Sequence, residues 1–188
     1  MKKASLLSTI CLLLLLLGCR KTETQKAPGV PVATEPKQGE VQTPYYPGLI
    51  EEYRTVLAED PDNLAALTAL GNAYFGNRQW TEAITLYERA LLFNPKDPDV
   101  RTDLGTAYRN IGMADRALVE YHTALEYDPG HLDARYNIGV VYASNKKNFR
   151  EAIRAWEDIL KFSPNYPEAE KMKATIMTFK KALKKDAQ

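Results

Sequence analysis

Few side chains in this sequence are of the types that catalyse reactions or hold metal ions. Histidine occurs only at His122 and His131, which lack the i, i+4 spacing of a helical zinc site. Cysteine occurs only at Cys11 and Cys19, near the N-terminus. The sequence contains neither a glycine-rich phosphate-binding loop nor a serine in a nucleophile elbow. We therefore expect no catalytic residue, no metal and no cofactor, and keep an enzyme with a cryptic site as a remote alternative.

The overall charge of the chain excludes another class of ligand. Its 25 Lys and Arg residues nearly balance its 24 Asp and Glu residues, which gives a formal net charge of +1. Such a balance lacks the basic footprint of a nucleic-acid-binding protein. A hydrophobic content of 45% is ordinary for a globular protein with a core. We therefore predict a folded chain that does not bind nucleic acid.

Residues 1–18 differ from this average. Lys2 and Lys3 precede an apolar run that includes the unbroken stretch 12–17, and the small residue Gly18 follows. A basic start, a short apolar stretch and a small residue at its end are typical of a secretory signal peptide. The run is shorter than the roughly 20 apolar residues of a transmembrane helix. The alternative is an uncleaved membrane anchor.

The stretch Leu16-Leu17-Gly18-Cys19 resembles the lipobox of bacterial lipoproteins. The resemblance implies that residues 1–18 are removed and that Cys19 receives diacylglycerol on its sulfur and a fatty acyl group, such as palmitate, on its amine. The lipid bilayer would then be a partner through Cys19. Since Arg20 and not an aspartate follows, the resemblance favours the periplasmic face of the outer membrane in an organism with two membranes. The mature chain would have no thiol left for a disulfide or a metal.

A proline-containing segment follows the cysteine. Residues 19–46 show no apolar periodicity and contain polar residues between Pro28, Pro31, Pro36 and Pro44. This composition predicts a disordered tether. A flexible chain of this length spans about 30 Å root-mean-square, so the folded part is expected near the membrane but not on it.

Five classes of residue recur along the rest of the chain at steps of 34 or 35, which is typical of a helical repeat array. In the first unit, Leu67, Leu70, Gly71 and Tyr74 are three or four residues apart, so they share one face of a helix. The absence of a side chain at the glycine lets the partner helix come close. The classes are Pro61, Pro95, Pro129, Pro164; Gly71, Gly105, Gly139; Tyr74, Tyr108, Tyr142; Leu70, Leu104, Ile138; and Ala83, Ala117, Ala152, each of these alanines followed by Tyr87, Tyr121 or Trp156.

This pattern resembles the tetratricopeptide repeat from about residue 47 to 185. The resemblance implies an all-α fold: a right-handed solenoid of three helix–turn–helix repeats with flanking N- and C-terminal helices. We predict a half-repeat at 47–60, repeats at 64–97, 98–131 and 132–166, and a capping helix at 167–185. Lysines cover much of the capping helix, as the exposed end of a solenoid requires.

Two features depart from the family pattern. The third repeat has one extra residue, which we place among residues 144–148 in the loop between its two helices. A position that is often tryptophan in the family is Leu67, Arg101 or Arg135 here. We expect the arginine stems to pack and their charged heads to reach solvent.

The resemblance also implies a binding site. Tetratricopeptide arrays bind a partner segment in a concave groove lined by the first helix of each repeat. The family's groove positions also fall on Asp99 and Asp133. We predict a partner-binding groove formed by Thr68, Asn72, Phe75, Thr102, Thr106, Arg109, Asn110, Tyr136, Asn137 and Val140.

These expectations favour one function over two others. We predict a membrane-anchored scaffold or assembly factor of the bacterial envelope that binds an envelope protein or peptide segment. A carboxylate clamp of the chaperone-binding type does not fit, because Asp103 and Asp133 stand where it needs cations or amides. The alternative is a protein of c-type cytochrome biogenesis that holds an apocytochrome, since 103–108, 134–139 and 155–157 look like modules of that group.

Overall fold

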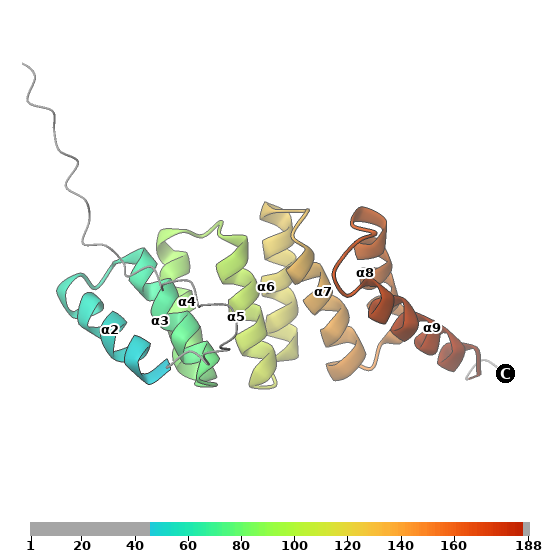
Figure 1. The fold of residues 1–188 in the computed structure, drawn as a ribbon, viewed down its shortest axis with the longest axis horizontal. Helices are drawn as coiled ribbons and strands as arrows, with labels where there is room; N and C mark the ends of the chain where they lie inside the picture. The colour runs from blue at the N-terminus through green and yellow to red at the C-terminus, as the bar shows by residue number, and fades with distance from the viewer. Residues whose placement is uncertain (1–45, 186–188) are drawn as a thin grey trace, which may run out of the picture. The chain divides into compact units, whose positions relative to one another are not determined.

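The computed structural model describes residues 46–185, where all regular structure is helical. Residues 1–45 lie outside the described residues. They include the predicted signal peptide at 1–18, the predicted lipidation site Cys19 and all but the last residue of the predicted tether at 19–46. Along the chain run α2 (Tyr46–Glu59), α3 (Leu64–Gly76), α4 (Trp80–Phe93), α5 (Pro98–Asn110), α6 (Ala114–Tyr127), α7 (Leu132–Val140), the π-helical turn η1 (Val141–Asn145), α8 (Phe149–Phe162) and α9 (Ala169–Lys185) (Figure 1).

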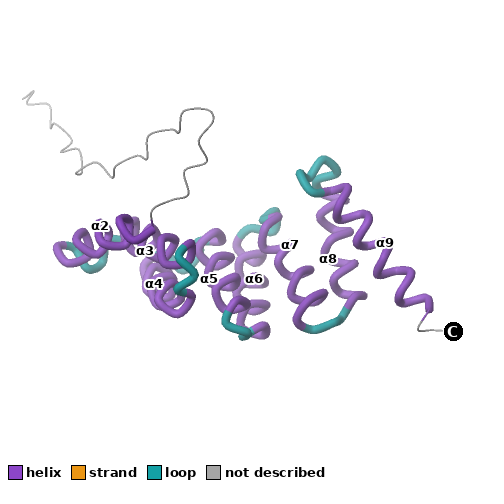
Figure 2. The backbone as a smooth tube through the Cα atoms, turned by 60° about the horizontal axis from the view of Figure 1, so that its bottom comes forward, coloured by secondary structure: helices purple, strands orange, loops and turns teal. Residues whose placement is uncertain are grey.

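The helices form three consecutive hairpins, α3–α4, α5–α6 and α7–α8, flanked by α2 and α9 (Figure 2). We call α3, α5 and α7 the A helices and α4, α6 and α8 the B helices. Each helix packs mainly against its neighbours along the chain, so most contacts between helices join segments that are close in sequence. The predicted fold class, a right-handed tetratricopeptide solenoid with flanking helices, is confirmed.

Each A helix begins at a side-chain cap two residues after a recurring proline. Asn63 Oδ1 accepts a hydrogen bond from the Ala66 backbone N–H (3.0 Å), and Asp97 Oδ1 accepts one from Val100 N–H (3.0 Å). His131 takes the same place at α7, where its Nδ1 accepts the Ala134 N–H (3.1 Å). Such caps satisfy backbone donors that have no partner within the helix. The proline turn and the cap together fix where the next repeat starts.

An aromatic ring from each B helix lies directly on the glycine of its A helix. A Cβ atom built on Gly71 would lie 2.7 Å from Cε1 of Tyr87, and one on Gly105 would lie 2.7 Å from Cε1 of Tyr121. In the third hairpin Gly139 meets Trp156 in the same way. The two tyrosines are almost completely buried, with exposed fractions of 1% and 0%. The glycine is therefore required by the ring that covers it, and not only by the approach of two backbones.

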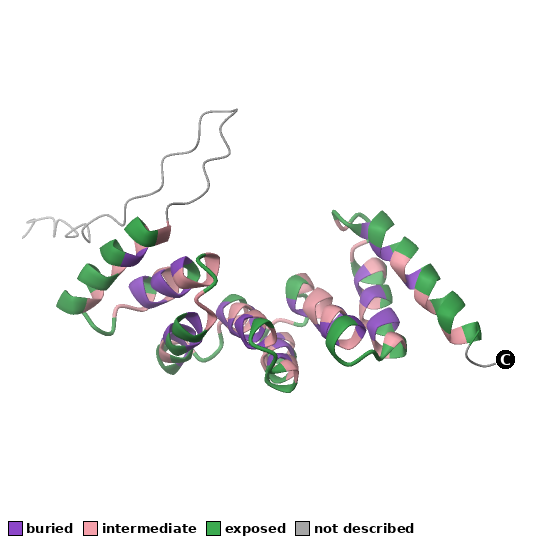
Figure 3. Ribbon diagram, turned by 90° about the horizontal axis from the view of Figure 1, so that it is seen from below, coloured by how far each residue is buried: buried purple, intermediate pink, exposed green. Residues whose placement is uncertain are grey.

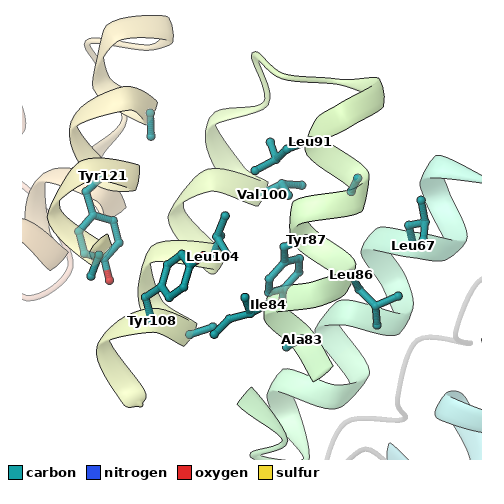
Figure 4. Packing of buried hydrophobic residues seen from close by; sticks show 14 of the residues in the cluster. Leu67, Ala83, Ile84, Leu86, Tyr87, Leu91, Val100, Leu104, Tyr108 and Tyr121 are labelled. Carbon is teal, nitrogen blue, oxygen red and sulfur yellow. The ribbon is translucent and has the colours of Figure 1, made fainter. Parts of the chain in front are cut away.

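The core continues between hairpins. Ile84 on α4 meets Leu104 and Tyr108 on α5 in the gap between the first and second repeats (Figure 4). A second cluster around Trp156, Ile159 and Met172 joins α8 to α9. Both clusters lie within residues 46–185, so this part of the chain holds the core it needs to fold by itself.

The third hairpin absorbs its extra residue in a helix and not in the loop. The bond that closes each A helix runs from Gln79 N–H to Tyr74 O in the first repeat, from Met113 to Tyr108 in the second and from Asn148 to Tyr142 in the third. The third therefore spans one residue more. Val141–Asn145 widens into a π-helical turn, so our placement of the extra residue in the loop is corrected.

The reason lies in the geometry of the turn. Arg78, Gly112 and Lys147 all have positive φ (61°, 84° and 53°) at the same place, directly before the residue that precedes the B helix. In all three hairpins a single residue separates this left-handed residue from the B helix, so the extra residue lies before the turn and not within it. The widened last turn of a helix accepts one residue by an i→i+5 bond, here Lys146 N–H to Val141 O (3.0 Å).

The recurring arginines do not extend their heads into solvent, which corrects another expectation. Arg101 donates from Nε and Nη2 to the Pro95 carbonyl (2.9 and 2.7 Å), and its Nη1 lies 2.7 Å from Glu120 Oε2. Arg135 donates to the Pro129 carbonyl (2.7 Å). The two side chains are only 16% and 18% exposed. Each arginine thus ties its A helix to the preceding turn.

In the first repeat, apolar side chains occupy the positions that correspond to this ion pair. Leu67 and Leu86, which precede Arg101 and Glu120 by 34 residues, are both buried. The Pro61 carbonyl still accepts from an arginine, Arg89 of the B helix (2.6 Å). The ion pair Arg101–Glu120 of the second repeat therefore occupies the same two repeat positions as the apolar pair Leu67–Leu86 of the first.

This equivalence gives a test of the arginine contact. Replacing Arg101 by Leu should lower the free energy of unfolding by about 1–3 kcal/mol, because Glu120 loses its partner in a site that is mostly shielded from water. Replacing both Arg101 and Glu120 by Leu should regain at least half of that loss, since the pair then resembles Leu67–Leu86. Urea unfolding measures both values. A double variant less stable than the single variant would contradict the equivalence.

Candidate partner-binding groove

The array bends into a shallow arc with α2 and α9 at its ends (Figure 3). The A helices line the inner side of this arc, where α5 contacts α7 directly. We define the inner face as the surface on the concave side of the arc. The solvent-facing side chains of α3, α5, α7 and α9 form it. It is the surface that the sequence assigns to a partner.

The structure places the predicted site residues on this surface with very different exposure. Two are open to solvent, Asn72 and Asn110. Seven are partly buried: Thr68, Phe75, Thr106, Arg109, Tyr136, Asn137 and Val140. Thr102 is buried, with an exposed fraction of 5%.

Three of the predicted residues mainly serve the fold. The Thr102 hydroxyl donates to the Pro98 carbonyl of its own helix (2.8 Å). Phe75 packs edge-to-face on Trp80 at the tip of the first hairpin, with 4.9 Å between ring centroids. Val140 packs against the C-terminal core cluster. Their spacing along the A helices is the same as that of their exposed neighbours, so sequence position alone could not separate them.

Two buried tyrosines of the B helices contact groove residues of the inner face from beneath, which the sequence did not predict. The Tyr87 hydroxyl donates to Asn72 Oδ1 (2.8 Å), and the Tyr121 hydroxyl lies 3.0 Å from Thr106 Oγ1. Each ring crosses over a glycine and ends beside a groove residue of the A helix. Burial, and then the charge of Asp103, raises the pKa of the Tyr87 hydroxyl, which therefore stays protonated and donates. The joint recurrence of glycine and aromatic residue was the signal available in the sequence.

The capping helix α9 completes the groove at its C-terminal end. Tyr136 of α7 and Trp156 of α8 meet Glu168, Lys171, Met172 and Thr175 around a small cavity of about 40 Å³. Tyr136 also stacks on Trp156 and lies near Tyr166, with 6.2 Å between ring centroids in both pairs. The cavity has room for one small side-chain group. Counting repeat positions onward from Pro164 would have found the α9 residues.

Carboxylates gather near the middle of the inner face. The pKa of Asp103 is raised to about 6, first by burial and then by the charges of Asp99, Asp133 and Asp97. His131 Nε2 lies 2.9 Å from Asp99 Oδ1. Because its Nδ1 accepts the Ala134 N–H, Nε2 must carry the proton and donate to Asp99. His131 thus links α5 to α7 across the groove.

Cations are fewer on the same surface. Arg109 lies near the Tyr121 hydroxyl, whose pKa its charge lowers against the larger effect of burial, and its Nε is buried without a hydrogen-bond partner. Lys171 lies at the α9 end. With Asp99, Asp103 and Asp133 on the inner face and Glu168 directly before α9, the charges do not suit the terminal carboxylate of a peptide.

The described helices contain neither a clustered set of metal ligands nor a helix suited to span a membrane. No group of three or more His, Cys, Asp or Glu residues between residues 46 and 185 lies close enough to hold a metal ion. Within the same range, no helix combines the length and the apolar composition that crossing a membrane requires.

The raised pKa of Asp103 has a consequence for stability. A carboxyl group whose pKa is higher in the folded state (about 6) than its ordinary value (3.8) binds its proton more tightly when folded. It favours folding at low pH, and this contribution is lost as the pH rises from about 4 to 6. Asp103→Asn should therefore match the wild type below about pH 4 and exceed its stability by about 1–3 kcal/mol above about pH 7.

Thermal or urea unfolding across this pH range measures the difference. The matched control is Glu126→Gln, an exposed carboxyl on α6, which should change stability by less than about 0.5 kcal/mol at every pH. A constant difference between wild type and Asp103→Asn over the whole range would show that the charge of Asp103 is not the cause.

Comparison with solved structures finds the same architecture in other proteins. MamA is 25% identical over 76% of this chain and 89% of its own, with a TM-score of 0.62. TTC0263, a thermophilic tetratricopeptide protein of Thermus thermophilus, is 19% identical over 69% of this chain and 71% of its own (TM-score 0.61). A tetratricopeptide repeat protein of Parabacteroides merdae is 24% identical over 73% of this chain and 54% of its own (TM-score 0.64).

A comparison with curated proteins gives no match. The sequence profile of the tetratricopeptide repeat matches residues 50–108 and 112–176, which together are more than half of the chain. These ranges contain the recurring glycines and aromatic residues whose contacts build the three hairpins. The chain therefore belongs to the tetratricopeptide repeat family.

Proposed function

We propose that this protein is a membrane-anchored scaffold that binds a segment of another envelope protein on its inner face. The tetratricopeptide fold itself suggests protein–protein interaction. The proposal rests mainly on two hydrogen bonds that hold polar side chains of the inner face in place. The Tyr87 hydroxyl bonds to Asn72, and the Tyr121 hydroxyl bonds to Thr106. Side chains held in place in this way lose little entropy when a partner binds.

The two ends of the inner face offer different contacts to such a segment. The α3 end presents the Asn72 amide, whereas the α9 end presents the small cavity beside Tyr136 and Trp156. The carboxylates Asp99, Asp103 and Asp133 lie between them. An extended segment with a small apolar anchor and no terminal carboxylate would fit this order. The alternative function, holding an apocytochrome, stays a prediction that no contact on the inner face favours.

The anchor is proposed from the sequence. Lys2, Lys3, the apolar run and Gly18-Cys19 support cleavage before Cys19 and acylation of its sulfur and amine. Two acyl chains already hold a protein stably on a bilayer, because each buried methylene contributes about 0.8 kcal/mol. Anchoring would raise the local concentration of the inner face for partners in the same membrane, so a weak groove would suffice.

The anchor is tested by labelling. Cells grown with a labelled fatty acid should incorporate the label into the wild-type chain and not into Cys19→Ala. The control is Cys11→Ala, which should still be labelled because that residue lies within the predicted signal peptide. Label in the Cys19→Ala protein would disprove acylation at this residue and leave the interaction function to stand alone.

The groove is tested by a triple substitution that avoids residues needed for folding. Arg109, Asn110 and Asn137 should be changed to Ala. We leave out Asn72 because it accepts the Tyr87 hydroxyl, and Tyr136 because it packs on Trp156. The buried Nε of Arg109 has no partner, so its removal should cost the fold little. We expect the triple variant to keep its melting temperature within a few degrees and to lose its partner.

The measurement is crosslinking in solubilised envelopes followed by mass spectrometry. Truncation of central interface residues costs about 1–2 kcal/mol each, and three together weaken a micromolar complex beyond detection even without strict additivity. The matched control changes His122, Glu126 and Lys161 to Ala on the exposed sides of α6 and α8. If this control loses the partner and the groove variant keeps it, the B helices and not the inner face bind the partner.

A further inference from the structure

The terminal helix α9 has an outer face with no helix packed on it among residues 46–185. Its apolar side, with Met172 and Ile176, is buried against the C-terminal cluster. On the opposite side lie exposed residues that follow one another at three- and four-residue steps along the helix: Lys173, Met177, Lys181, Lys184 and, beside them, Lys185. We call these five residues the α9 outer face. Figure 3 shows this side of the terminal helix largely exposed.

The charge of α9 is unlike that of the rest of the chain. The helix contains six lysines and one glutamate, which gives +5. Because the whole chain sums to +1, the remainder carries −4. Lys173 is paired with Glu170 (2.8 Å) and Lys180 with Glu157 (2.6 Å), while Lys181, Lys184 and Lys185 make no ion pair within residues 46–185. The unbalanced charge is therefore concentrated at the C-terminal end of the array.

A polar end would be enough to keep a solenoid soluble, and a single sign of charge is not needed for it. Added carboxylates improve solubility more than added lysines do. The face also exposes 59% of Met177 in the middle of its lysines. A cluster of lysines on one helix face is attracted to the negative surface potential of anionic phospholipids.

We propose that the α9 outer face binds the surface of a bilayer that contains anionic phospholipids. The helix of 17 residues is about 25 Å long, so it can lie along the surface with several lysines near phosphate groups at once. Long lysine stems let the ammonium groups reach the phosphates while Met177 contacts the headgroup region. The contact does not depend on the proposed acyl anchor. It would add a second, salt-sensitive attachment at the opposite end of the folded array.

The experiment uses residues 20–188, because the apolar run at 6–17 would bind vesicles by itself and residues 46–185 hold the whole core. The chain is sedimented with vesicles of phosphatidylcholine alone and with vesicles that also contain phosphatidylglycerol. We expect binding only to the anionic vesicles and release at high salt. Equal binding to both vesicle types, or no binding to either, would overturn the proposal.

A matched pair of variants assigns the binding to α9. Lys181, Lys184 and Lys185 changed to Gln should reduce binding to anionic vesicles roughly a hundredfold, since each lysine near an anionic surface contributes about fivefold. Lys96, Arg150 and Lys161 changed to Gln remove the same charge from exposed places elsewhere and should reduce binding less than about threefold. Equal losses in the two variants would show a non-specific effect of net charge and overturn the assignment.

Two further measurements distinguish membrane binding by α9 from binding to nucleic acid and from partner binding on the inner face. A DNA duplex at equal phosphate concentration should compete poorly with anionic vesicles, and capture of the chain by DNA in preference to vesicles would overturn the membrane assignment. The groove variant at Arg109, Asn110 and Asn137 should bind vesicles as the wild type does. The lysine variant should in turn keep the protein partner, so failure of one proposal leaves the other testable.

Discussion

The contact on which the rest of this structure depends is the one between a glycine of each A helix and an aromatic ring of its B helix. Tyr87 on Gly71, Tyr121 on Gly105 and Trp156 on Gly139 set the separation of the two helices in every hairpin. The fully buried Ala83, Ala117 and Ala152, one turn before each ring, let the B helix come near enough for this contact. A larger residue at either place would push the helices apart and open the core. The ring also ends on the inner face, so one contact sets both the hairpin and the orientation of the groove's polar side chains.

Stacking of the hairpins depends on a second, simpler device. The carbonyl groups of Pro61, Pro95 and Pro129 each accept a hydrogen bond from an arginine, although the arginine comes from a B helix in the first case and an A helix in the others. Each turn between repeats is thereby held to a helix of the repeat that follows it. Since these turns fix the position of each A helix relative to the next, the spacing of groove residues from repeat to repeat follows from them. Burial, and then the charges of Asp99, Asp133 and Asp97, raise the pKa of Asp103, so the ionised form of this side chain is disfavoured in the folded state.

Much of the fold could be predicted from the sequence, because each repeat has the same residue types at the positions where its two helices and its turn make contact. Recurrent proline, glycine and aromatic residues predicted the hairpins, and residue spacing predicted which side of each A helix faces outward. Contacts that depend on a particular pair of side chains were not predictable in this way. Nothing in the spacing separates Thr102, which bonds to its own helix, from the open Asn110, and nothing places the Arg101 head on the Pro95 carbonyl. The π-helical turn at 141–145 was missed for a similar reason: one extra residue can enter a loop or a helix, and only the fixed left-handed residue of the turn decides between them.

The replacement of tyrosine by Trp156 in the third hairpin gives the protein a spectroscopic property. The chain has two tryptophans: Trp80 packs on Phe75 at the tip of the first hairpin, whereas the indole of Trp156 borders the small cavity beside Tyr136 and donates its N–H to the Tyr136 carbonyl (3.2 Å). A group that enters the cavity changes the polarity around one indole and leaves the other in its original surroundings. With Trp80 replaced by Phe, the emission of the remaining indole would follow occupancy of the C-terminal end of the groove without an added dye. The ring that closes the third hairpin would thus also report optically on any group that enters the cavity.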